Sequence, residues 1–100
     1  MNDPADAPWG DPPARWNHYT KHRNTLGVAT EQEYDESARD TERCGRRFTF
    51  RDRSSGARRV GYFERATGRF TVLNERETRI RSHYVTSERQ IRGLLESDYR

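Results

Sequence analysis

Two of the chain's three histidines, His18 and His22, stand four residues apart, and its only lysine, Lys21, directly precedes the second. Residues at this spacing share one face of a helix. An imidazole titrates near neutral pH and can remove or deliver a proton, and a neighbouring ammonium stabilises negative charge. This cluster therefore indicates acid-base chemistry on an anionic substrate. A solvated polar helix face with no chemical role is the alternative that the sequence leaves open.

A zinc site is the third interpretation of these histidines. A metalloprotease helix needs the Glu of an H-E-x-x-H motif directly after the first histidine, where this chain has Tyr19. Cys44 is the only cysteine, and the charge of Lys21 opposes a bound cation. We therefore expect neither a metal ion nor another cofactor.

Cleavage of RNA without a metal needs a base for the 2′-hydroxyl, an acid for the departing 5′-oxygen and donors for the charge on the phosphate. The chain contains all of these residue types. We expect acid-base chemistry and phosphate stabilisation from His22, Lys21 and Ser82, with His18, His83 and Thr86 in second rank. We expect contacts to RNA from Arg69, Arg81, Thr71 and Tyr84.

His83 creates a conflict within this set. It lies between Ser82 and Tyr84 in an alternating segment, and successive strand residues point to opposite faces. The three side chains can line one cleft only if a β-bulge intervenes. The sequence leaves this conflict open.

The elements that must position these residues follow from hydrophobic periodicity. Residues 15–23 predict a short helix with Trp16 and Tyr19 along one face, together with Arg23. The capping pattern of Thr30 and Glu33 predicts a second helix through about residue 40, with Tyr34 and Ala38 as its buried stripe. Alternating segments predict four strands near residues 48–53, 60–65, 69–74 and 78–85, and a helical segment follows Ser87. The predicted fold class is α+β: two N-terminal helices packed on a four-stranded antiparallel β-meander, with a short C-terminal helical segment.

Each predicted strand has two sets of side chains. We expect one set to face the helices: Phe48, Phe50, Val60, Tyr62, Phe70, Val72, Ile80 and Tyr84. The other set is richer in arginine and is the expected surface for a phosphate-bearing ligand: Arg47, Thr49, Arg51, Phe63, Arg65, Arg69, Thr71, Leu73, Arg81, His83 and Val85.

Proline and charge are unevenly distributed along the chain. Residues 1–14 hold all four prolines and predict a flexible leader, on which only Trp9 is a candidate to dock, so residues 15–100 form the expected single domain. Residues 1–42 carry nine acidic and four basic residues, whereas residues 43–100 carry seven acidic and fifteen basic residues. A basic half indicates an anionic partner such as nucleic acid, although a solvated arginine-rich surface has the same composition.

Membrane insertion and disulfide bonding are not expected. No apolar run approaches the about 20 residues of a membrane span, and a single cysteine forms no internal disulfide. We therefore expect no membrane partner and a reducing, cytoplasmic location.

The order of several short motifs is similar to that of a known family. KHRNTLG at residues 21–27 is followed by EQEY at 31–34, YFERATGRFTVLN at 62–74 and TRIRSHYVTSE at 78–88. This order resembles ribonuclease toxin domains of the barnase, EndoU, colicin and RelE-like (BECR) superfamily, found in polymorphic, contact-dependent and phage toxins. In that superfamily a Lys-His-Gly motif lies on the first helix, and a late strand reads roughly I-x-T-x-F.

The resemblance implies a metal-independent endoribonuclease toxin that cleaves cellular tRNA or mRNA by attack of the 2′-hydroxyl. Lys21 and His22 match the family's Lys-His pair, and Ser82 and Tyr84 match the Thr and Phe of the late strand. Arg23 stands where the family has glycine, and Ser82 keeps the hydroxyl of the threonine that it replaces. The resemblance also implies a cognate immunity protein or antitoxin, and action in the cytoplasm of the producing cell or of a target cell after delivery.

A hypothesis from another class is a non-catalytic basic module. Such a module would use its arginines to bind RNA or an acidic protein, and an antitoxin or inhibitor belongs to this class.

Overall fold

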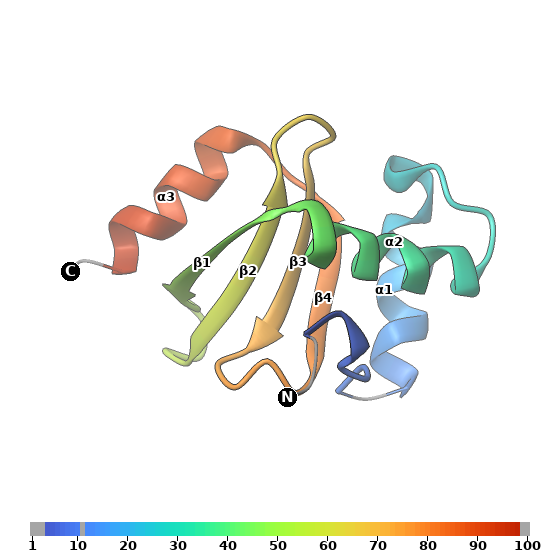
Figure 1. Ribbon diagram of the computed structural model, residues 1–100, viewed down its shortest axis with the longest axis horizontal. Coiled ribbons are helices and arrows are strands. Elements are labelled where there is room, and N and C mark those ends of the chain that lie inside the picture. The colour runs from blue at the N-terminus through green and yellow to red at the C-terminus, as the bar shows by residue number, and fades with distance from the viewer. Residues whose placement is uncertain (1–3, 11, 99–100) are drawn as a thin grey trace.

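The computed structural model of the chain describes residues 4–10 and 12–98 (Figure 1). Its elements are η1 (Pro4–Asp6), α1 (Pro12–Leu26), α2 (Glu31–Cys44), β1 (Arg46–Arg51), β2 (Arg58–Glu64), β3 (Arg69–Asn74), β4 (Ile80–Val85) and α3 (Glu88–Asp98). The predicted α+β fold class is confirmed: two helices precede a four-stranded antiparallel sheet, and a short helix follows it.

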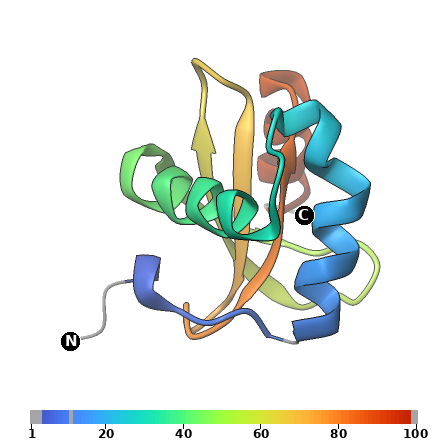
Figure 2. The same cartoon turned by 90° about the vertical axis from the view of Figure 1, so that its right-hand side faces the viewer.

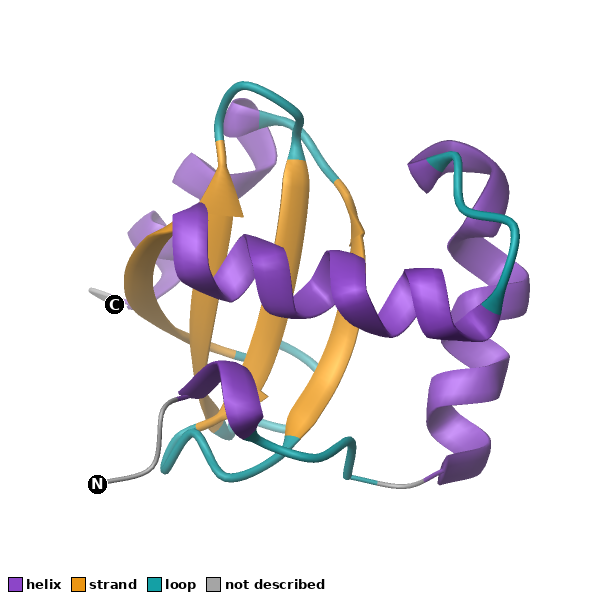
Figure 3. Cartoon of the chain, turned by 45° about the vertical axis from the view of Figure 1, so that its right-hand side comes forward, coloured by secondary structure: helices purple, strands orange, loops and turns teal. Residues whose placement is uncertain are grey.

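The sheet is a meander with strand order β1-β2-β3-β4, and every neighbouring pair is antiparallel. Figure 3 shows α2 lying across the strands of one face. Figure 2 shows α3 on the opposite side of the sheet from α2, and α1 standing beside β4. The sheet therefore has two covered faces, and α1 lies along one of its edges.

The strand faces differ from the sequence prediction. Phe48 pairs with Gly61 and Thr49 pairs with Val60, and residues paired in this way share a face of the sheet. Phe48 of β1 and Val60 of β2, which were predicted to share a face, therefore lie on opposite faces. Phe48 and Phe70 stack over Gly61, where an added Cβ would lie 2.5 Å from the Phe70 ring. The prediction that all the listed apolar residues share one face is therefore wrong.

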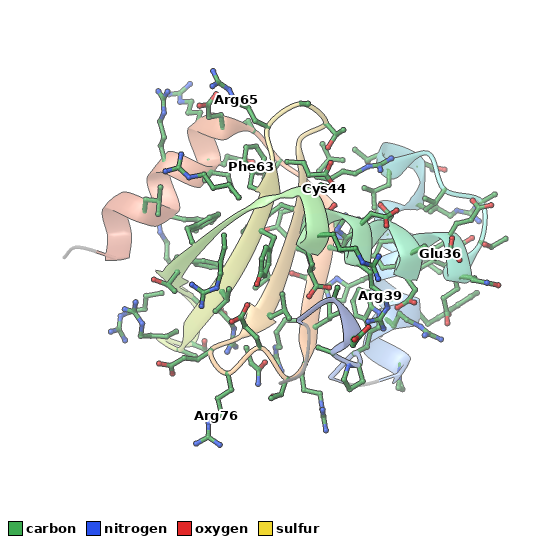
Figure 4. All side chains as sticks on the ribbon, viewed as in Figure 1. Glu36, Arg39, Cys44, Phe63, Arg65 and Arg76 are labelled. Atoms are coloured by element: carbon green, nitrogen blue, oxygen red, sulfur yellow. The ribbon has the colours of Figure 1, made fainter. Side chains whose placement is uncertain are left out.

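Two apolar clusters form instead, one on each face. The first lies under α2 and contains Ala7, Trp9, Tyr19, Leu26, Tyr34, Ala38, Val60, Tyr62, Leu73 and Ile80. The second lies against α3 and contains Phe50, Phe63, Phe70, Val72 and Ile91, with Phe48, Tyr84, Leu94 and Leu95 packed around it. Figure 4 shows Phe63 close to α3. The expected open, arginine-rich face is thus replaced by the α2 core.

His83 lies on the edge strand β4, on the α2 side of the sheet, and is fully buried. The Tyr34 hydroxyl donates to its backbone carbonyl, and the Ser37 hydroxyl lies 2.8 Å from its Nε2. Its Nδ1 lies 2.9 Å from the Thr71 hydroxyl. These bonds join α2 to β3 and β4 through one side chain.

The hydrogen bonds assign the tautomer of His83. Because the Thr71 hydroxyl donates to the Ala38 carbonyl at 3.0 Å, its oxygen accepts from His83 Nδ1–H. Nδ1 also faces the Phe70 carbonyl at 3.2 Å, which can only accept. His83 Nε2 then accepts from Ser37, and the ring is neutral with both nitrogens satisfied. Burial, the dominant cause, lowers the pKa of His83 to about 3.

The N-terminal segment is not the predicted flexible leader over residues 4–10. Ala7 and Trp9 are buried in the α2 core, and Trp9 Nε1 donates to Asp35 at 2.7 Å. Arg39, labelled in Figure 4, donates to the carbonyls of Ala5 and Ala7. The domain therefore starts before the predicted boundary at residue 15. Residues 1–3 and 11 lie outside the described residues.

The two N-terminal helices are longer than predicted: α1 spans Pro12–Leu26 instead of residues 15–23, and α2 ends at Cys44 instead of about residue 40. The Thr30 hydroxyl accepts from Glu33 N–H at 3.1 Å, which confirms the predicted cap of α2, but the Glu33 carboxylate accepts from the N–H of Ala29.

On α1 Tyr19 is buried as expected. Trp16 is 53% exposed and does not join the core, because Tyr19 and Leu26 define the inward face of α1.

Acid should destabilise the fold through His83. Its unfolded pKa near 6.5 lies above the folded value, so the unfolded chain binds more protons and stability falls as pH drops below 6.5. From pH 6.5 to pH 5 this group alone should cost about 2 kcal/mol of unfolding free energy. Urea titrations at several pH values measure the loss. A His83 ring that titrates near pH 6.5 by NMR in the folded protein would contradict it.

Candidate active site

Three rings on α1 and β4 form a continuous row with Trp9. The His18 ring lies 6.4 Å from the Trp9 ring, and it stacks on His22 at 6.0 Å and 13°. The His22 ring in turn lies 5.6 Å from Tyr84 of β4. Both histidines are half-buried. The predicted sharing of one helix face is confirmed, and this face is turned toward the β4 edge of the sheet.

Strand alternation resolves the conflict over β4. Ser82 pairs with Val72 and Tyr84 pairs with Phe70, and both partners belong to the α3-side cluster. His83 points to the other face, into the α2 core. The register shift of β4 lies at Val72/Leu73, before Ser82, so it leaves this alternation unchanged. Ser82 and Tyr84 therefore face the α3 side, where His22 of α1 contacts Tyr84. The His83 ring faces the α2 side, and the charge of His22 reaches it from α1.

A hollow of about 370 Å³ opens beside this cluster, between the end of β4, the β1–β2 turn and α3. Its lining residues are Arg53, Tyr84, Thr86, Gln90, Gly93 and Leu94. Tyr84 belongs both to the hollow and to the contact with His22. A ligand in the hollow would therefore contact Tyr84, the ring that His22 contacts.

The environment of His18 and His22 favours neutral imidazoles. Burial lowers the pKa of both rings, and the charge of Lys21 lowers both further. The charge of Arg81 also lowers the pKa of His18, and His18 lowers that of His22. Among the described residues, His18 Nδ1 is buried with no hydrogen-bond partner, which adds to the cost of an imidazolium. Each ring can thus accept a proton near neutral pH.

The Tyr84 hydroxyl remains a hydrogen-bond donor. Burial raises its pKa, and the nearby Asp52 carboxylate raises it further. Asp52 itself is ionised, because bonds from Ser54 lower its pKa, and it lies 3.9 Å from the Arg59 guanidinium. A neutral phenol at this position can donate to a phosphate oxygen.

Of the remaining predicted site residues, some lie near the α1 histidines or the hollow, and the others lie on the His83 side of the sheet. Lys21 and Arg81 are exposed, and their charges reach the histidines. Thr86 lines the hollow and donates to the Gln90 side chain. Thr71 is fully buried in the bond network of His83, and Arg69 lies on the His83 side of the sheet, where its charge lowers the pKa of that ring. Burial thus leaves neither Thr71, predicted to contact RNA, nor His83, predicted to act in acid-base chemistry, open to a substrate in this structure.

Several residues of the hollow carried no signal in the sequence. Arg53 lies in the β1–β2 turn, and Gln90 and Leu94 lie on α3. Turn arginines and helical glutamines are common, and only the packing of α3 against the sheet brings them next to Tyr84. Ser87 did predict the start of α3, and its hydroxyl accepts from Gln90 N–H at 3.2 Å.

Among residues 4–10 and 12–98, no group of three or more His, Cys, Asp or Glu side chains is arranged to hold a metal ion. Within the same residues, no helix has the length and apolar character needed to cross a bilayer. Comparisons with protein-family models, with curated proteins and with solved structures find no match to this chain.

The coupling between the charges of α1 and β4 predicts a pattern of histidine titration. Lys21→Met should raise the pKa of both His18 and His22, whereas Arg81→Met should raise mainly that of His18. NMR titration of the ring protons measures each value. Arg23→Met removes an exposed charge from the same helix and serves as the matched control. Equal shifts in all three variants would contradict the assigned geometry.

Proposed function

We propose that this domain is a metal-independent endoribonuclease that cleaves RNA by attack of the 2′-hydroxyl. The observation that carries the proposal is the contact between the half-buried His22 ring and Tyr84, on the sheet side that also presents Ser82 and beside an open hollow. Tyr84 thus links a proton acceptor on α1 to a binding space, and Ser82 adds a second hydroxyl on the same side of β4.

The proposed reaction starts with His22. Its neutral ring takes the proton of a 2′-hydroxyl, the 2′-oxygen bonds to phosphorus, and the bond from phosphorus to the 5′-oxygen breaks. The 5′-oxygen leaves with a proton from the imidazole pair formed by His18 and His22. The products are a 2′,3′-cyclic phosphate and a 5′-hydroxyl. Tyr84, Ser82 and Lys21 stabilise the charge that develops on the phosphate.

The biological setting of the proposal comes from the motif resemblance. A ribonuclease toxin of this kind acts on tRNA or mRNA in the cytoplasm, and an immunity protein or antitoxin restrains it. The net charge of +3 and the predominance of arginine suit a polyanionic substrate and an acidic inhibitor.

Replacement of His22 should separate catalysis from binding. We expect His22→Ala to reduce RNA cleavage by about 10²- to 10⁴-fold, the usual contribution of a general base, with little change in RNA affinity or melting temperature. Cleavage of labelled RNA in EDTA, filter binding and circular dichroism measure the three quantities. Arg23→Ala is the control on the same helix. Wild-type protein that binds RNA without cutting it would support the non-catalytic module instead.

The pH dependence of cleavage should follow His22 as a base. Because its pKa is lowered from 6.5, kcat/KM should rise with pH through a midpoint below 6.5 and be level at neutral pH. A pH–rate profile in EDTA tests this. A rate that keeps rising above pH 8 would point to a different base.

A further inference from the structure

The hollow beside Tyr84 has an unusual combination of walls. The Tyr84 ring and the Leu94 side chain supply apolar surface, whereas Thr86 and Gln90 supply a hydroxyl and an amide. Arg53 stands at the rim, where its guanidinium donates to the Gly93 carbonyl at 3.3 Å. The hollow therefore offers one aromatic face, one apolar face, an amide that both donates and accepts, and a cation.

We propose that this hollow binds one unpaired base of the RNA substrate, next to the phosphate held at His22. The inference rests on the proposed ribonuclease function. Proteins recognise single-stranded RNA by stacking splayed bases on aromatic or guanidinium planes and by hydrogen bonds to the base edges. Tyr84 and Arg53 can stack on a base, and Gln90 can form hydrogen bonds to its edge.

Gln90 is placed to read a base edge. The Thr86 hydroxyl donates to its Oε1, and the backbone N–H of Gln90 bonds the Ser87 hydroxyl at the start of α3. The Thr86 contact holds the amide oxygen at the hollow, and the Ser87 contact anchors the Gln90 backbone at the start of α3. An amide held in this way can form paired donor and acceptor bonds to a base, which typically discriminate by about 1–3 kcal/mol.

Gly93 keeps the wall of the hollow open. It lies inside α3, where glycine is about 1 kcal/mol less favourable than alanine. An added Cβ would meet only the Arg53 guanidinium, at 3.9 Å, so alanine fits, whereas a leucine side chain would extend into the hollow. Gly93→Ala and Gly93→Leu thus form a graded pair of variants.

A second hollow on the other flank of α3 provides an internal control. It has a volume of about 430 Å³, and its lining includes Phe63 of β2 and Ile91 and Arg92 of α3. Tyr84 lines the first hollow but not the second, so the Tyr84 ring does not link the second hollow to His22. Arg92 has a 73% exposed side chain, and Arg92→Ala removes one positive charge from α3 without altering the first hollow.

The experiment compares base preference with overall affinity. Fully 2′-O-methylated hexamers of A, C and U cannot be cut, and fluorescence anisotropy measures their dissociation constants. We expect wild-type protein to prefer one of them by at least about fivefold. Gln90→Ala and Gly93→Leu should reduce that preference to less than twofold, Gly93→Ala should keep it, and Arg92→Ala should weaken all three hexamers equally.

The outcomes separate the base site from the ribonuclease. If the wild type has no preference, or if Gln90→Ala and Gly93→Leu leave the preference intact, the base site is wrong even when RNA cleavage is observed. If the preference depends on these residues but the wild type never cuts unmodified RNA, the base site stands and the ribonuclease proposal falls. Absence of both binding and cleavage overturns both.

Discussion

The buried imidazole of His83 is the interaction on which the rest of the arrangement depends. The ring accepts from Ser37 of α2 and donates to Thr71 of β3, and the Tyr34 hydroxyl donates to the backbone carbonyl of His83. One residue of β4 with a neutral side chain therefore joins α2 to two strands. A buried polar group that is fully bonded specifies one packing, because any shift leaves a donor or acceptor unpaired. The position of α2 over the sheet, and with it the orientation of β4, follows from this network.

The same constraint determines which side of the sheet Ser82 and Tyr84 face. Because His83 points into the α2 core, its neighbours Ser82 and Tyr84 must point to the other side of the sheet. There α1 stands beside β4 and brings His22 against Tyr84. The third histidine is thus structural, while the two histidines of α1 remain half-buried with lowered pKa values. The alternation of β4 thus places His83 in the core, whereas His18 and His22 lie on α1, outside that strand.

The helices and strands were predictable from the sequence, but the face of the sheet on which each strand residue lies was not. Period and capping signals identified both N-terminal helices and all four strands, because these signals are local. The face of each strand depends on the hairpin register, which places Phe48 opposite Gly61 and depends on packing across the whole sheet. Burial of Trp9 likewise depends on contacts with Asp35 and Ile80, far along the chain. The motif resemblance pointed to His22, Ser82 and Tyr84, and the hollow beside them arises only from the packing of α3.

The chemical identity of the RNA product ends distinguishes attack by the 2′-hydroxyl from other routes of cleavage. A short single-stranded RNA should be incubated with the domain in excess EDTA, and the fragments should be analysed by mass spectrometry. We expect fragments ending in a 2′,3′-cyclic phosphate, paired with fragments that begin with a 5′-hydroxyl. Fragments with 5′-phosphate ends, or cleavage that requires a divalent metal ion, would contradict attack by the 2′-hydroxyl with His22 as the base.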